Sequence, residues 1–203
     1  MVVWLALLTT IAAATPCEPY PPVRLRADIA MVTDAIADGD LADARARLGA
    51  IGERLPCSSA VVDAGVFAKF ARYMALTHPL AADDAGTTRW LLSSRVADPD
   101  LPWNPAAFPI GHVLRSRATE ATWPPTSELT QGLKPPRDGG VFLNGHLAFD
   151  ASAPEGVPFL AQAFDGEGRR IDAWWQEGGR FPAEYLSKQF RDVAWPVWWR
   201  PQG

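Results

Sequence analysis

The chain has 203 residues, of which 48% are hydrophobic and 21% charged, and its formal net charge is -4 at pH 7. These values are those of ordinary globular proteins, which excludes wholesale disorder and a membrane-protein composition. The 19 basic residues are scattered against 23 acidic ones, so nucleic acid is not an expected partner. Sixteen of the basic residues are arginines, a bias that either carboxylate or phosphate recognition or GC-rich coding would produce.

An uncharged apolar run opens the chain and gives way to proline and polar residues. The run is too short to span a bilayer comfortably as a helix. Residues 1–14 resemble a secretory signal peptide, with Ala12 and Ala14 offering an A-x-A-like cleavage point. We therefore expect an exported protein, periplasmic or extracellular. A lipoprotein in which Cys17 is acylated is the alternative.

The chain contains two cysteines, Cys17 and Cys57. In the oxidising compartment that export implies, an even pair is most simply a disulfide. Neither cysteine belongs to a C-x-x-C motif or lies beside a histidine, so the sequence gives no local support for metal binding or thiol catalysis.

Residues 15–99 are predicted to form a helical domain. Apolar residues recur there at helical spacing, and breaks of a few residues interrupt the pattern. The predicted helices cover residues 24–36, 41–55, 59–77 and 80–97. Because the breaks are short, the four helices should pack as two antiparallel hairpins.

The hairpins resemble tetratricopeptide-type repeats, in which small and aromatic residues recur at fixed positions of the second helix before a proline. The residues that carry the resemblance are Gly86, Trp90, Ser93 and Pro99, and in the first hairpin Ala44, Leu48, Ile51 and Pro56. The resemblance covers residues 24–99 and implies stacked helix-turn-helix units with a peptide-binding surface. A plain four-helix array is the alternative.

Residues 100–140 are predicted to be a proline-rich connecting segment. Four prolines fall within residues 98–112, which rules out a regular helix there, and two Pro-Pro pairs fall within residues 122–140. The second stretch is interpreted as a linker packed on the surface. The alternative is a polyproline ligand for an aromatic groove.

Residues 141–203 are predicted to contain a small antiparallel β module. Asn144-Gly145 lies between two short alternating apolar runs, which is the strongest short-range signal of a β-hairpin. Further alternating runs surround Phe159–Ala163 and Ile171–Trp175, and the turn "DGEG" separates them. The chain as a whole is therefore predicted to be α+β, with helices first and strands second.

The module resembles β-sandwich modules of the PEGA or carboxypeptidase-regulatory type. The residues that carry the resemblance are Asn144, Gly145, Pro154, Gly156 and Phe159–Ala163. The resemblance implies a small β-sandwich in which the Asn and Gly are turn residues and nothing is catalytic. Helical repeats followed by such a module also resemble exported proteins of myxobacteria-like Gram-negative bacteria.

Tryptophan is unusually frequent near the end of the chain, where five of the nine tryptophans follow residue 173. We predict a helix over residues 183–193 and, after it, a Trp-rich tail. The tail packs over the sheet, or it contacts a partner or glycan, or it lies at a membrane interface, and self-packing is the favoured interpretation. The candidate partner contacts are Trp174, Trp195, Trp198 and Trp199.

No zinc-protease, nucleophile-elbow, Walker or dinucleotide motif occurs, and His78, His112 and His146 fall in separate predicted loops. The sequence therefore identifies no catalytic, cofactor-binding or metal-binding residue, and no cofactor is expected. The predicted function is a non-enzymatic exported binding or assembly protein with an envelope protein or glycan as partner. Membrane association beyond the signal peptide is not expected. The alternative is a cell-envelope hydrolase with a site at the helix-sheet junction.

Overall fold

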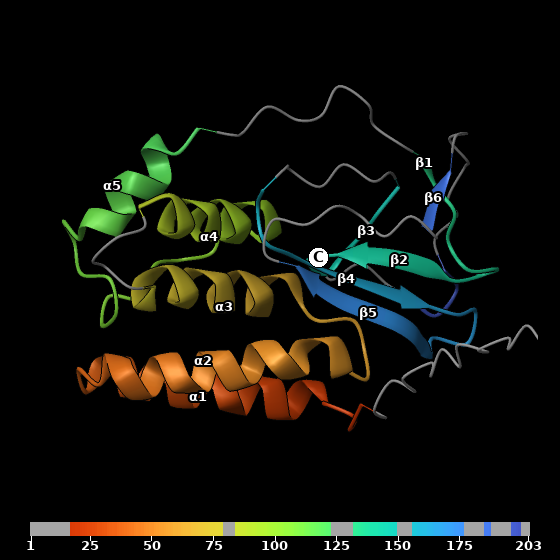
Figure 1. Cartoon of the computed structure of the whole chain (residues 1–203), viewed down its shortest axis with the longest axis horizontal. Coiled ribbons are helices and arrows are strands. Elements are labelled where there is room, and N and C mark those ends of the chain that lie inside the picture. The colour runs from red at the N-terminus through yellow and green to blue at the C-terminus, as the bar shows by residue number, and fades with distance from the viewer. Residues whose placement is uncertain are drawn as a thin grey trace, which may run out of the picture.

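The computed structural model describes residues 17–78, 84–122, 132–149, 156–176, 185–187 and 196–199. Within these residues the helices come first and the antiparallel strands second, which confirms the predicted α+β class. In the view of Figure 1 the helices lie on the left and the four-stranded sheet on the right. The predicted signal peptide lies outside the described residues.

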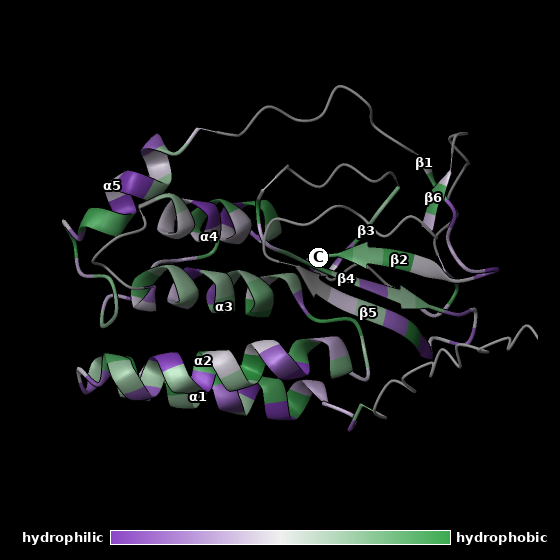
Figure 2. Ribbon diagram, viewed as in Figure 1, coloured by the Kyte–Doolittle hydropathy of each residue, from purple (hydrophilic) through white to green (hydrophobic). Residues whose placement is uncertain are grey.

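Four helices form where the apolar periodicity predicts them. They are α1 (Pro22–Ala37), α2 (Leu41–Arg54), α3 (Ala64–Thr77) and α4 (Asp84–Ala97). The closest packing is between α1 and α2 and between α3 and α4, so the helices form two neighbouring hairpins (Figure 1). On α1 the buried stripe includes Leu25, Ile29 and Val32, and Figure 2 shows hydrophilic and hydrophobic residues interspersed along α1 and α2.

Helix α3 begins at Ala64, five residues later than the predicted start. Asp63 caps it, because its Oδ1 accepts a hydrogen bond from the backbone N–H of Val66 at 3.0 Å. A 3₁₀ turn, η1 (Leu55–Cys57), ends the preceding hairpin, and residues 58–63 form a non-helical connector between η1 and α3. The connector is non-helical because its backbone groups are used by the sheet, as described below.

A fifth helix, α5 (Val113–Glu120), was not predicted. Its sequence is largely polar and Leu114 is its one buried residue, so it has no apolar stripe from which a helix could be inferred. The helix is fixed from outside: Arg95 of α4 donates hydrogen bonds to the carbonyls of Ala118 (2.8 Å) and Ala121 (3.0 Å) at its C-terminal end.

The four-stranded sheet has the order β3-β2-β4-β5, and all its neighbours are antiparallel. The strands are β2 (Gly140–Leu143), β3 (His146–Leu147), β4 (Phe159–Phe164) and β5 (Arg170–Gln176). Strand β4 is buried along its whole length, because it lies in the centre of the sheet and both its faces are covered. Figure 2 shows the hydrophobic character of β2 and β4.

A separate two-stranded pairing joins β1 (Gly132–Leu133) to β6 (Leu186–Ser187). The helix predicted over residues 183–193 is wrong at Leu186 and Ser187, and the other described residue of that range, Tyr185, is not α-helical. The register places Leu186 opposite Leu133, which is fully buried, so strand pairing satisfies the backbone there. The remainder of the predicted helix lies outside the described residues.

The predicted hairpin turn forms at Asn144 and Gly145, which have φ values of 48° and 90°. Two successive positive φ angles are the conformation that Asn-Gly favours in a two-residue hairpin loop. Asn144 also binds the neighbouring strand: its backbone N–H donates to the carbonyl of Leu160 (2.8 Å), and its Oδ1 accepts from the N–H of Leu160 (2.9 Å). The turn residue therefore holds β4 as well as closing the hairpin.

The sheet docks onto the connector through a buried amide. The side chain of Gln162, which is 1% exposed, accepts a hydrogen bond from the N–H of Val62 (2.9 Å) and donates one to the carbonyl of Ala60 (3.1 Å). Leu160 of the same strand belongs to the hydrophobic core of the helices. Leu160 therefore joins β4 to the core of the helices, while the other core residues of the sheet form two clusters of their own.

Helix α4 provides two further contacts with the β part. Ser93 donates a hydrogen bond to the carbonyl of Pro158 (2.7 Å), and His146 Nε2 donates to the carbonyl of Ala97 (2.6 Å). Both acceptors are backbone carbonyls at the ends of elements, so the docking of the two parts satisfies groups that a helix or strand end leaves open.

A substitution at Gly145 tests how closely the sheet docks onto the connector. A Cβ at this position would lie 2.5 Å from the carbonyl oxygen of Val62 and 2.6 Å from the nitrogen of Ala64, whereas a Cβ at Gly39 would meet nothing within 4 Å. Both residues have a positive φ. We expect Gly39→Ala to cost about 1 kcal/mol through backbone strain and Gly145→Ala to cost about 2–4 kcal/mol because overpacking adds about 1–3 kcal/mol. Urea denaturation measures both, and equal losses would contradict the close docking.

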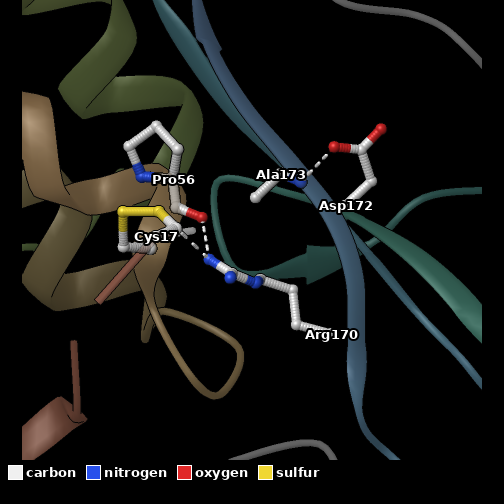
Figure 3. The surroundings of a disulfide bond; sticks show 6 residues. Cys17, Pro56, Arg170, Asp172 and Ala173 are labelled. Carbon is white, nitrogen blue, oxygen red and sulfur yellow. Dashed lines mark hydrogen bonds between the residues drawn. A yellow bond between two sulfur atoms is a disulfide. The ribbon is translucent and has the colours of Figure 1, made fainter. Parts of the chain in front are cut away.

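The predicted disulfide between Cys17 and Cys57 is present, with a Cα–Cα distance of 5.4 Å. The disulfide uses the sulfur atom that acylation would need in the lipoprotein alternative. The adjacent backbone forms an isolated parallel bridge between Tyr20 and Ser58. Figure 3 shows Arg170 of β5 reaching the carbonyl of Pro56 beside the disulfide, so the sheet contacts this end of the helices as well.

Tyr20 is a second attachment of the N-terminal segment. Its side chain is fully buried and donates a 2.6 Å hydrogen bond to Asp28, and the guanidinium of Arg54 lies 4.0 Å above its ring. Burial and the hydrogen bond to Asp28 raise the pKa of the Tyr20 hydroxyl above its ordinary value. The segment is therefore held by side-chain packing in addition to the covalent bond.

Replacing both cysteines by alanine should destabilise the protein. Closing a loop of 40 residues removes chain entropy from the unfolded state, so the loss should reach up to about 4 kcal/mol. Urea denaturation of the double variant against the oxidised protein measures the difference. Mass spectrometry after alkylation of the native, non-reduced protein provides the control, because two modified thiols there would contradict the bond.

Candidate functional site

Two tryptophans of the tail return to the four-stranded sheet. The ring centroid of Trp198 lies 5.8 Å from that of Phe142 and 5.6 Å from that of Phe164, and Trp199 lies 4.7 Å from Phe142. Both phenylalanines are fully buried. At these positions the tail packs onto the protein itself, as the favoured interpretation of the sequence predicts. Trp195 lies outside the described residues.

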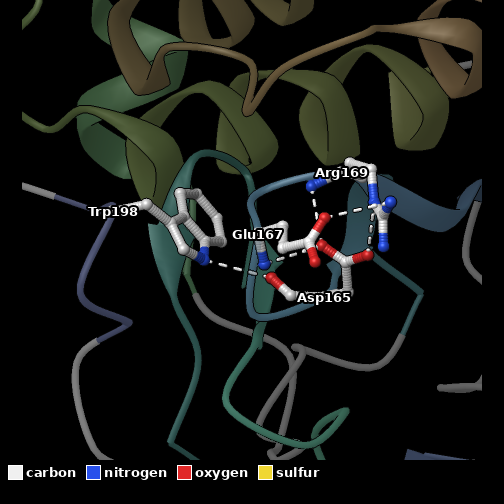
Figure 4. Close-up of polar contacts among 4 residues, drawn as sticks. All are labelled: Asp165, Glu167, Arg169 and Trp198. Carbon is white, nitrogen blue, oxygen red and sulfur yellow. Dashed lines mark hydrogen bonds and ion pairs between the residues drawn. The ribbon is translucent and has the colours of Figure 1, made fainter.

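The turn between β4 and β5 fixes Trp198. Its Nε1 donates a 3.0 Å hydrogen bond to the carbonyl of Asp165, as Figure 4 shows. The carboxylate of Asp165 accepts from the backbone N–H groups of Arg169 and Glu167 and from the Arg169 guanidinium. The Arg169 backbone N–H, with these other donors, holds the pKa of Asp165 below its ordinary value. The acidic residues of "DGEG" therefore stabilise the turn.

A pocket of about 390 Å³ lies where the tail, the connector and the start of α1 meet, and we call it the junction pocket. Its wall is formed by Pro22, Leu25, Arg26, Ser58, Ala60, Val61, Val62, Asp63, Val66, Phe164, Gly168, Trp198 and Trp199. Most of these side chains are apolar, and Trp198 and Trp199 are part-exposed. The pocket thus has an apolar wall with two indole rings on one side.

The polar groups of the junction pocket are few. Ser58 is 2% exposed, and its hydroxyl has no hydrogen-bond partner among the described residues. The carboxylate of Asp63 already accepts the hydrogen bond that caps α3, and Arg26 is exposed. A ligand that fills the pocket therefore gains apolar burial and one hydrogen bond to a hydroxyl that is otherwise unsatisfied.

The remaining candidate residues lie elsewhere. Trp174 stacks on Tyr185 at a centroid distance of 5.0 Å, in the cluster that contains Leu133. His112 caps α5 by accepting a hydrogen bond from the N–H of Leu114. The residues that line the junction pocket include no histidine. The described part of the chain also holds no group of three side chains suited to a metal ion.

The connector is the part of the site that the sequence did not indicate. Residues 59–63 were predicted to be helical, because Val62 begins the spacing that continues along α3. The capping carboxylate of Asp63 is the signal that marks the true start of α3, since Asp at an N-cap is strongly preferred.

No protein-family model, curated protein or solved structure matches this chain. The resemblances to tetratricopeptide-type repeats and to PEGA-type modules therefore stay predictions. None of the helices in the described residues is long and apolar enough to cross a membrane.

Removing the indole of Trp198 should lower stability. The ring is part-buried between two phenylalanines, so we expect Trp198→Ala to cost about 2–3 kcal/mol. Val197→Ala is the matched control, since Val197 is 98% exposed and its truncation should change stability by less than about 0.5 kcal/mol. Chemical denaturation of both variants gives the comparison, and equal midpoints would show that Trp198 contributes nothing to the stability of the fold.

Proposed function

We propose that this chain is a non-enzymatic exported binding or assembly protein of the cell envelope, and that the junction pocket is its binding site. The observation that carries the proposal is the joint construction of the pocket from α1, the connector and the Trp-bearing tail. A concave apolar site with few polar groups is the usual form of a ligand pocket. The resemblance to helical repeats and a PEGA-type module points to the same class.

Export is supported by two features. The apolar N-terminal run has the pattern of a signal peptide, and Cys17 and Cys57 form a disulfide, a bond that persists in oxidising compartments. The same disulfide, with the hydrogen bond from the N–H of Ser59 to the carbonyl of Tyr20, holds the segment before α1 next to the connector.

The occupant is an apolar or aromatic side chain of a partner polypeptide. The wall offers indole faces and aliphatic side chains, and Ser58 provides a hydroxyl at its inner surface. An aromatic anchor that fills an apolar pocket is the typical energetic centre of a protein interface. A glycan stacked on Trp198 and Trp199 would use the same rings, and the experiment below separates the two.

Site-specific photocrosslinking in the exporting cell tests the proposal. A photoreactive phenylalanine derivative is placed at Arg26, which is exposed and lines the junction pocket, and as a control at Arg24, which is exposed on α1 and does not line it. We expect a covalent adduct from position 26 that position 24 does not give.

The nature of the adduct decides the class of partner. Loss of the added mass on protease treatment identifies a polypeptide, whereas an adduct that survives protease and yields to glycosidases identifies a glycan. Absence of an adduct at position 26, or the same adduct at both positions, would contradict binding through the junction pocket.

A further inference from the structure

A second pocket, of about 250 Å³, lies between α3, α4, α5 and the segment that follows α4. Three of its wall residues carry its chemistry: Arg72 of α3 and Ser94 and Arg95 of α4. We call it the arginine pocket. It shares no wall residue with the junction pocket, and the inference drawn from it does not rest on the proposed function.

Arg72 is a buried cation, and three of its five N–H donors make no hydrogen bond within the described residues. It is 7% exposed, and its guanidinium lies 4.0 Å from the ring centroid of Trp103. Within the described residues its hydrogen bonds are two, both from Nη1, to the carbonyls of Leu101 (3.0 Å) and Pro102 (3.1 Å). Its Nε and Nη2 groups donate to none of the described acceptors.

The charge of Arg72 is also poorly balanced. Burial lowers the pKa of Arg72, the nearby Arg115 lowers it further, and Asp98 and Tyr73 oppose this change. No described carboxylate lies within ion-pair distance of its guanidinium. Arg72 lines the pocket, where a bound anion would accept hydrogen bonds from its unused donors and add to the partial compensation by Asp98.

Ser94 adds an unsatisfied donor beside this cation. The residue is 1% exposed, and its hydroxyl has no hydrogen-bond partner among the described residues. The next residue, Arg95, is held in place by its bonds to the carbonyls of Ala118 and Ala121, so it brings a second fixed positive charge to the wall.

We propose that the arginine pocket binds a carboxylate. The Nε and Nη2 edge of a guanidinium presents parallel N–H donors whose spacing matches the two oxygens of a carboxylate, and the Ser94 hydroxyl supplies a third donor. The carboxyl group of Asp98 near Arg72 disfavours a doubly charged phosphate. The pocket volume admits a small acid or the last residue of a peptide.

Binding is tested by titrating the mature protein with acetate, with N-acetyl-alanyl-alanine and with the C-terminal amide of the same dipeptide. Labelling with ¹⁵N-arginine and observing the Arg72 Nε–H resonance reports on the site directly. We expect a saturable shift with a carboxylate and none with the amide. A response to acetate alone identifies a small acid as the ligand, and a tighter response to the dipeptide acid identifies a peptide C-terminus. Inorganic phosphate binding more tightly than either acid would overturn the carboxylate assignment.

Two variants separate binding from folding. Arg72→Lys keeps the positive charge but loses the pair of parallel N–H donors of the guanidinium. Calorimetry should therefore show carboxylate binding weakened at least tenfold, and the exposed Arg45→Lys is the control. Ser94→Ala removes a hydroxyl that makes no hydrogen bond within the described residues. The Ser94→Ala variant should therefore keep or raise the melting temperature and weaken carboxylate binding several-fold. The exposed Ser116→Ala is its control. Unchanged affinity in Ser94→Ala and in a folded Arg72→Lys would overturn the proposal.

Discussion

The position of the sheet on the helices depends on a contact that leaves no room for a side chain. The turn residue Gly145 lies against the backbone between Val62 and Ala64, where α3 begins. The buried amide of Gln162 binds the same stretch of backbone from β4. Because Asn144 joins the turn to β4 by two further hydrogen bonds, the glycine and the amide are held in a fixed relation. The connector is thereby held in a non-helical conformation, and in that conformation Ser58 and Val61 form part of the wall of the junction pocket.

Much of the fold follows from local patterns. The apolar spacing of Leu25, Ile29 and Val32 predicts α1 because one face of the helix is buried, and Asn144-Gly145 predicts its hairpin because few residue pairs adopt two positive φ angles. Helix α5 could not be predicted in this way, because bonds from Arg95 and a single buried leucine hold it rather than an apolar face of its own. Strand β6 was mistaken for a helix because its pairing with β1 is a long-range contact that no local spacing reports.

The sites are less predictable than the fold, for the same reason. The frequency of tryptophan singled out Trp198 and Trp199, but their place beside the connector depends on how the chain returns to the sheet. The excess of arginine suggested carboxylate or phosphate recognition as one of two explanations, and composition does not say which arginine is concerned. Burial makes that distinction. Arg72 is buried and has N–H donors without an acceptor among the described residues, whereas the guanidinium of Arg169 forms ion pairs with Asp165 and Glu167 in an exposed turn.

Helix α4 links the arginine pocket to the β part. Ser93 donates to Pro158 in the β part, and the next two residues, Ser94 and Arg95, line the arginine pocket, so docking of the sheet also fixes the helix that carries this wall. The arginines of the pocket hold backbone that has little structure of its own, namely the carbonyls of Leu101 and Pro102 and the end of α5. Arg72, the residue proposed to bind the carboxylate, also donates to the carbonyls of Leu101 and Pro102. The bonds that position this guanidinium use only its Nη1, so the Nε and Nη2 edge is left for the carboxylate.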